Sequence, residues 1–195
     1  AAAEPFVMLS QRSERVRSHA GQVSFPGGKQ DPQDANSLET ALRETHEEIG
    51  LPQEKVEIIG KLDQILSLHY YLVTPFVALI QEDFVPVPNE DEIEAVFKVP
   101  LSFFMNSEQH WTEEFKTPIA TILAHHFEFE CFDIWGLTAK LILRLLEIGL
   151  GHVPDFPCLL YTSDAADDSL RVDLGGRRII KKLCVFGSFG GVTRW

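Results

Sequence analysis

Cysteine, methionine and positive charge are all scarce in this chain of 195 residues. It has three cysteines and two methionines, and 17 Lys and Arg residues stand against 29 Asp and Glu, giving a formal net charge of −12. Cys131, Cys158 and Cys184 have neither metal-ligand nor disulfide-framework spacing, so a reducing compartment is the default. Cys131 stands in an apolar stretch and is expected in the core. The negative charge argues against nucleic acid as the main partner.

The chain also lacks an apolar run of the length needed to span a membrane. Hydrophobic residues make up 45% of it, which is enough for one domain with a full core. These absences leave no reason to expect membrane or nucleic-acid binding.

The most informative run is the acidic segment that ends at Gly50. Glu44, Glu47 and Glu48 stand at i, i+3 and i+4, so a helix would gather three carboxylates on one side. Like charges repel at that spacing, and a hard divalent cation with oxygen ligands would explain it. From the spacing alone, a solvated acidic face remains the alternative. Asp34 is the expected N-cap and Gly50 the C-terminal stop.

The residues around these glutamates resemble the Nudix box. Its second half is matched by Arg43, Glu44, Glu47, Glu48, Gly50 and Leu51. The first half departs from the pattern, because Gly28 lies one residue too far from Arg43 and Asp34 stands at the usual Glu position. Thr45 replaces the usual aliphatic residue, and its methyl group is expected to face the core.

A second pattern lies just upstream. It comprises Leu9–Ser13, Arg17, Gly21 and Phe25–Gly28, and it resembles the extra motif of Nudix enzymes that cleave coenzyme A. Arginines beside a metal site are natural anchors for phosphate oxygens, so Arg12 and Arg17 are assigned to the substrate, with surface salt bridging as the alternative. Gly27 and Gly28 allow close backbone approach and are assigned to the substrate as well.

Later segments extend the resemblance to roughly residues 6–157. Residues 88–97 and 134–139 are similar to the corresponding parts of the coenzyme A diphosphatases, and the second of these segments is closest to the peroxisomal branch. His125 and His126 are adjacent on an expected strand, so they point to opposite faces and are unsuited to share one metal ion. We interpret them as structural, with one of them a candidate substrate contact.

The resemblance implies an α/β fold, the Nudix α/β/α sandwich with a mixed sheet. It also implies metal-dependent hydrolysis of coenzyme A and its acyl derivatives to 3′,5′-ADP and 4′-phosphopantetheine or its acyl form. Mg²⁺ or Mn²⁺ would be held by Glu44, Glu47, Glu48 and the Gly28 carbonyl. Arg43 would orient Glu47, and Glu48 or Glu92 would be the general base.

Four alternatives or open points accompany this interpretation. The substrate could be another nucleoside diphosphate derivative, such as ADP-ribose or a dinucleotide, and a non-catalytic binding module is the alternative of another class. The oligomeric state is left open between monomer and homodimer. The resemblance implies a peroxisomal address, with mitochondrial or cytoplasmic alternatives, although no Ser-Lys-Leu signal is present in this chain.

The segment from Cys158 onward differs in character. Its beginning, CLLYTSDAADD, resembles a translated sequencing-library adapter. We therefore expect a domain at residues 1–157, with part of the first strand and anything before it missing, and a non-native tail at 158–195. A genuine linker with a short hairpin is the alternative.

Periodicity predicts the elements of the domain. Strands are expected at residues 6–10, 23–25, 56–66, 70–80, 95–99 and 119–129. Helices are expected at about 35–49 and 136–148, with a single turn at 101–105.

Overall fold

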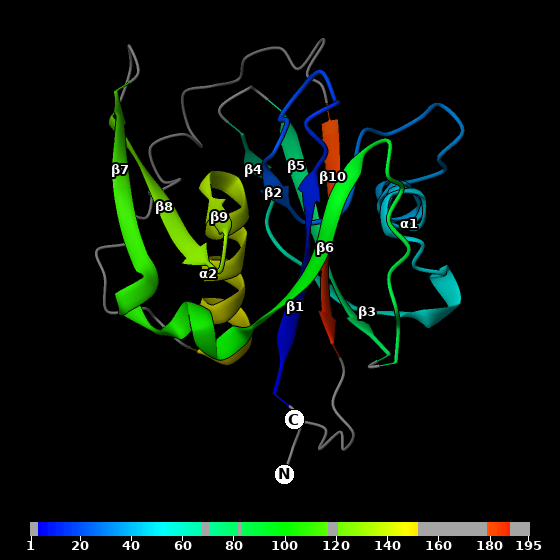
Figure 1. Ribbon diagram of the computed structural model, residues 1–195. Coiled ribbons are helices and arrows are strands. Elements are labelled where there is room, and N and C mark those ends of the chain that lie inside the picture. Colours follow the sequence, from blue (N-terminus) through cyan, green and yellow to red (C-terminus); the bar gives the residue numbers. More distant parts are fainter. Residues whose placement is uncertain (1–3, 68–70, 82, 117–120, 152–178, 188–195) are drawn as a thin grey trace, which may run out of the picture.

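A computed structural model describes residues 4–67, 71–81, 83–116, 121–151 and 179–187, and it places a mixed sheet between two helices (Figure 1). The elements in chain order are β1 (Phe6–Arg12), β2 (Val23–Ser24), α1 (Ser37–Ile49), η1 (Gln53–Lys55), β3 (Val56–Lys61), β4 (Ile65–Leu66), β5 (Leu72–Ile80), β6 (Ile93–Pro100), η2 (Leu101–Met105), η3 (Ser107–Gln109), β7 (His110–Lys116), β8 (Thr121–Phe129), β9 (Phe132–Trp135), α2 (Gly136–Leu150) and β10 (Ile179–Gly187). The η elements are short 3₁₀ helices.

The central sheet has the order β2-β1-β10-β5-β3, with β4 added to β5 and β6 added to β1. Strand β10 runs parallel to β5 and antiparallel to β1, so the sheet is mixed. Strands β7, β8 and β9 form a second, antiparallel sheet. This arrangement confirms the predicted α/β class.

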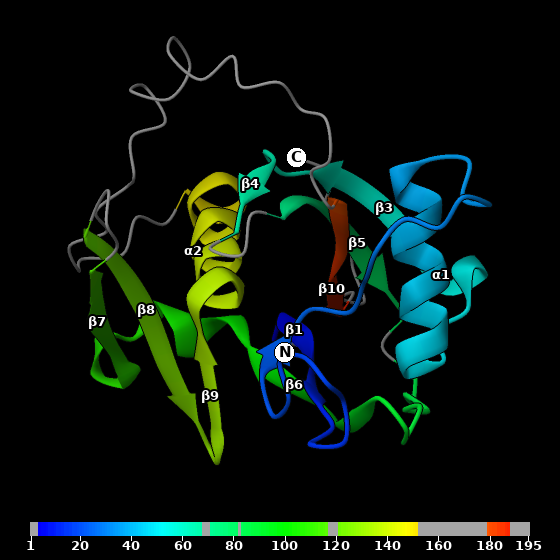
Figure 2. The ribbon, with the colours of Figure 1, turned by 90° about the horizontal axis from the view of Figure 1, so that it is seen from above.

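Alternate residues of β1 pack on opposite sides of the sheet, as the period of a strand requires. Met8 belongs to the core beneath α1, together with Ala41, whereas Val7 belongs to the core beneath α2, together with Ile142. Seen from above, α1 and α2 lie on opposite sides of the sheet (Figure 2). Among the described residues no helix is long and apolar enough to cross a membrane, since the longest, α2, has 15 residues.

Most predicted elements are found, with instructive differences. The strand expected at 56–66 is split, because Leu62 turns into the core and is 6% exposed while β3 ends and β4 begins on either side of it. The prediction missed β7, whose sequence HWTEEFK has mostly exposed side chains and no apolar alternation. Residues 70 and 119, where two predicted strands begin, lie outside the described residues.

The prediction that Cys131 lies in the core is wrong. Cys131 is exposed, in the tight turn that joins β8 to β9. The preceding Glu130 has a φ of 55°, a left-handed conformation typical of such hairpin turns. The apolar residues next to Cys131 in the sequence belong to β8 and β9, not to the turn.

Strand β10 comes from the segment that the sequence predicts to be a non-native tail. Its backbone pairs with β5 from Ile179 opposite Leu72 to Gly187 opposite Ile80, and it pairs with β1 at two positions. Residues 158–178 lie outside the described residues. The domain boundary after residue 157 therefore stays a prediction.

The second sheet contains a histidine pair. His110 Nε2 lies 2.9 Å from His125 Nδ1, and His126 on the next position turns to Asp133 instead, at 3.0 Å. The two adjacent histidines thus take different partners on different strands. Burial, together with the neighbouring His125 and His126, lowers the pKa of His110 to about 4. Burial also lowers the pKa of His125.

These shifts predict a loss of stability in mild acid. The folded pKa of His110 is below its ordinary 6.5, so between pH 6.5 and about 4 the unfolded chain binds a proton that the folded chain does not. The contribution of His110 to the free energy of unfolding is complete above pH 6.5. It falls toward pH 4, by at most about 1.4 kcal/mol per pH unit. We expect His110→Gln to flatten the fall of the urea midpoint between pH 7 and 4 relative to the wild-type chain. Parallel curves for wild type and His110→Gln would contradict this.

Candidate active site

The helix that carries the acidic residues, α1, begins later than predicted. Its N-cap is Asn36, whose Oδ1 accepts from the backbone amides of Leu38 and Glu39, both at 3.0 Å. The prediction of Asp34 as the cap is wrong, because its carboxylate is taken up by Arg43. The sequence held a usable signal, since Asn36 and Glu39 have the spacing of a capping box.

The end of α1 is as predicted. Gly50 has φ 70°, a left-handed conformation that glycine adopts without strain, and its amide closes the last turn on the His46 carbonyl at 2.9 Å. Thr45 is 1% exposed and faces the core, with its hydroxyl donating to the Ala41 carbonyl at 2.6 Å. The departure from the aliphatic pattern at this position therefore costs no buried, unsatisfied hydroxyl.

Three glutamates of α1 occupy three different environments. The side chain of Glu47 is 54% exposed, that of Glu44 is 20% exposed, and that of Glu48 is 4% exposed. Glu44 lies against Gly28, where an added Cβ atom would overlap its carboxylate. Any other residue at position 28 would therefore displace Glu44.

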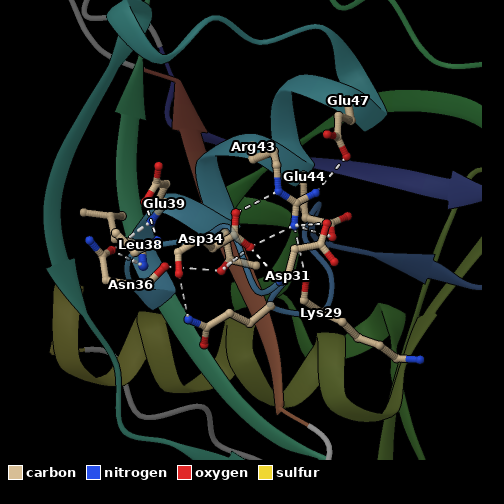
Figure 3. Close-up of polar contacts among 12 residues, drawn as sticks. Lys29, Asp31, Asp34, Asn36, Leu38, Glu39, Arg43, Glu44 and Glu47 are labelled. Atoms are coloured by element: carbon tan, nitrogen blue, oxygen red, sulfur yellow. Dashed lines mark hydrogen bonds and ion pairs between the residues drawn. The ribbon is translucent and has the colours of Figure 1, made fainter.

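Arg43 lies at the centre of this acidic cluster (Figure 3). Its Nε and Nη2 donate to the two oxygens of Asp34, at 2.9 and 3.0 Å. The same guanidinium reaches Glu44 at 3.1 Å and Glu47 at 2.9 Å. It holds the pKa of Asp34 well below its usual range, and Asp34 in turn raises the pKa of Arg43. Asp34 thus fixes Arg43, and Arg43 fixes two of the three glutamates.

Glu44 is partly buried and lies beside other negative charges. Burial raises its pKa, Arg43 opposes that shift, and the charges of Glu48 and Glu47 add to it. Within the described ranges, no three carboxylate, imidazole or thiolate side chains already converge on one point. The donors nevertheless are all oxygens, and the lack of a side chain at position 28 lets the Glu44 carboxylate lie close to that backbone, so these residues fit a hard divalent cation.

Glu48 is where the two sequence patterns meet. Its Oε2 accepts from the backbone amide of Gly27 at 3.0 Å, and its Oε1 lies 3.4 Å from Nη1 of Arg12. Gly27 has φ 133°, which no other residue adopts readily, and this conformation presents the amide to the carboxylate. Arg17, by contrast, is exposed in the loop after β1.

The turn before β6 is attached to the same region. The amide of Asn89 donates to the Glu48 carbonyl at 3.0 Å, and the Glu92 carbonyl accepts from the Ser13 amide at 2.8 Å. Glu92 itself has an exposed side chain. The structure therefore places the turn beside Glu48 and Arg12, while a catalytic role of the Glu92 carboxylate stays a prediction.

Lys29 was not singled out by the sequence. Its carbonyl accepts from Arg43 at 3.2 Å, but its side chain points away from the acidic cluster (Figure 3), with Nζ 5.7 Å from the centre of the Tyr71 ring. Its position directly after Gly28 is the sequence feature that could have identified Lys29 as a neighbour of the site.

Comparison with known proteins places this site in context. Residues 2–119 match the family model described as NUDIX domain. An uncharacterized Nudix hydrolase NudL of Yersinia enterocolitica is 38% identical over 144 residues, which cover 74% of this chain and 74% of that protein.

Two plant proteins are also similar. Nudix hydrolase 15, mitochondrial, and Nudix hydrolase 22, chloroplastic, both of Arabidopsis thaliana, are each 36% identical over 156 residues, or 77% of this chain. Those residues cover 55% and 52% of the two plant proteins, so the chain spans about half of their length.

Proposed function

Because the chain belongs to the Nudix hydrolases, enzymes that hydrolyse derivatives of nucleoside diphosphates, we propose that its substrate is coenzyme A or an acyl-coenzyme A. The reaction cleaves the diphosphate bond and gives 3′,5′-ADP and 4′-phosphopantetheine or its acyl form. One observation carries the substrate assignment. The residues of the coenzyme A-type pattern, Arg12 and Gly27, both contact Glu48 of the Nudix box.

Nudix hydrolases generally need a divalent metal ion, and we assign Mg²⁺ or Mn²⁺ to Glu44, Glu47, Glu48 and the Gly28 carbonyl. Such an ion supplies charge neutralisation on the diphosphate and a lowered pKa for water. The mixture of exposed and buried carboxylates supports this assignment, since Mg²⁺ keeps several waters and uses few protein ligands.

The protein's own residues have separate tasks. Arg43 keeps Glu44 and Glu47 together against their mutual repulsion, and Asp34 holds Arg43 in place. Glu48 is our first candidate for the general base that removes a proton from the attacking water, and Glu92 is the second.

The substrate is held by groups at the edge of the site. Arg17 is exposed and offers a guanidinium to the phosphates, among them the 3′-phosphate that distinguishes coenzyme A from ADP-ribose. Gly27 and Gly28 let the diphosphate approach the backbone closely.

A side-by-side turnover experiment tests the assignment. The purified full chain, with Mg²⁺ or Mn²⁺, is incubated with coenzyme A, ADP-ribose and a dinucleotide, and products are identified by mass spectrometry. We expect the highest kcat/KM for coenzyme A, with 3′,5′-ADP as a product. A preference for ADP-ribose or the dinucleotide would overturn the coenzyme A assignment and keep the family activity. Absence of turnover with all three would favour the non-catalytic binding module.

Compartment and assembly complete the proposal. We assign the enzyme to the peroxisome on the resemblance of residues 134–139, with a mitochondrial or cytoplasmic address as the alternative. The name of the plant relative Nudix hydrolase 15, mitochondrial, is compatible with the mitochondrial alternative. The site described above is built within one chain, so a monomer suffices and a homodimer is compatible with it.

A further inference from the structure

We propose that Arg12 is a positioning residue for Glu48, and that it acts through this carboxylate instead of holding a phosphate of the substrate. This differs from the role that its sequence pattern suggests. The inference rests on the proposed function insofar as Glu48 belongs to the catalytic site.

Backbone hydrogen bonds hold Arg12 in place independently of the contacts of its side chain. Arg12 is the last residue of β1, its amide donates to the Gln22 carbonyl at 3.0 Å, and its carbonyl accepts from Gly21 at 3.1 Å. The side chain is 22% exposed, and its Nη1 ends 3.4 Å from Glu48 Oε1. A guanidinium that faces a buried carboxylate, at the end of a mostly covered side chain, is poorly placed to meet an incoming phosphate.

Glu48 needs such a partner. Its side chain is 4% exposed, and a buried charge is costly unless it is paired and hydrogen-bonded. It also lies in the last turn of α1, where the helix dipole is unfavourable to negative charge, and it shares the helix with Glu44 and Glu47. The Gly27 amide serves one oxygen and Arg12 serves the other, so the carboxylate is held from two sides.

Arg17 provides the matched comparison. It belongs to the same sequence pattern, carries the same charge and lies five positions further along the chain, but it is exposed. A phosphate anchor and a positioning residue should respond differently to the same substitution at these two positions.

The test measures Mn²⁺ binding without substrate, by the electron paramagnetic resonance signal of free Mn²⁺. We expect Arg12→Gln to weaken binding about tenfold or more, as loss of a residue that orients a metal ligand does, and Arg17→Gln to change it less than about twofold. The direction of the change in Mn²⁺ affinity distinguishes a positioning role from a simple effect of charge. Removing a positive charge would by itself strengthen cation binding, so unchanged or tighter binding in Arg12→Gln would overturn the proposal.

Two further measurements separate positioning from a general loss of structure. In a Glu48→Gln background, Arg12→Gln should weaken Mn²⁺ binding no further, and full additivity would contradict the coupling. Arg12→Lys keeps the charge and should still weaken binding, because an ammonium lacks the planar fork of donors. If Arg12→Gln does not fold, Arg12→Lys tests whether Arg12 positions Glu48.

Kinetics on coenzyme A complete the experiment. Arg12→Gln should lower kcat about tenfold or more with KM within about threefold, whereas Arg17→Gln should mainly raise KM. A raised KM with unchanged kcat in Arg12→Gln would return Arg12 to the substrate. If the wild-type chain does not cleave coenzyme A, the proposed function fails, but the Mn²⁺ titration still decides the role of Arg12.

Discussion

Glu48→Gln is expected to lower kcat/KM for coenzyme A by about 10²–10⁴-fold, the range typical for loss of a general acid or base. A neutral amide neither removes a proton from water nor balances the charge of a cation. Gln has nearly the same shape, and its carbonyl oxygen can still accept from the Gly27 amide, so the fold should survive. Steady-state kinetics together with a thermal melt measure both effects.

Glu39→Gln is the matched control. Glu39 is exposed in the first turn of the same helix, and its carboxylate accepts from the Ala35 amide at 2.7 Å, which a glutamine oxygen can also do. This variant should keep wild-type turnover. Wild-type turnover in Glu48→Gln would exclude Glu48 from the reaction and would point to a contaminating activity.

Deletion of residues 158–195 is expected to abolish the cooperative thermal transition of the chain. Among the described strands, β10 alone joins β1 to β5. Without it, β1 keeps β2 and β6, and β5 keeps β3 and β4, so the central sheet falls into two parts with unpaired edges. A domain whose total stability is about 5–15 kcal/mol does not withstand the loss of a central strand.

The control deletion removes only residues 188–195 and leaves β10 in place. It should melt like the full chain, as followed by circular dichroism. The pairing of β10 does not decide whether residues 158–195 are native to the protein, because any strand of suitable length can pair with two open edges. A deletion of 158–195 that melts and turns over like the full chain would instead support the predicted domain end at residue 157.

How much of this could be read from the sequence depends on whether a feature is local. The end of α1 at Gly50 and the inward turn of Thr45 were predictable, because helix periodicity and a C-terminal glycine act within a few residues. The N-cap was missed by two residues, since Asp34 and Asn36 are both good caps and only the pairing of Asp34 with Arg43, nine positions along the chain, decides between them.

Contacts between distant segments could not be predicted in the same way. The contact of Arg12 with Glu48 joins residues 36 positions apart, and it depends on how β1 and α1 pack on one sheet. Strand β7 was missed because its exposed, charged sequence gives no alternation, and its place is set by pairing with β8. The identity of the site residues follows from the resemblance to a family, whereas their spatial arrangement follows from the fold.

Glu48 is attached to other segments through both its side chain and its backbone carbonyl. We therefore expect the acidic run to tolerate no inserted residue. Its side chain holds the segments around Arg12 and Gly27, and its carbonyl holds the turn at Asn89. One residue added within the last turn of α1 would rotate everything beyond it by about 100°. Three segments that are far apart in the chain would then lose their common anchor in a single step.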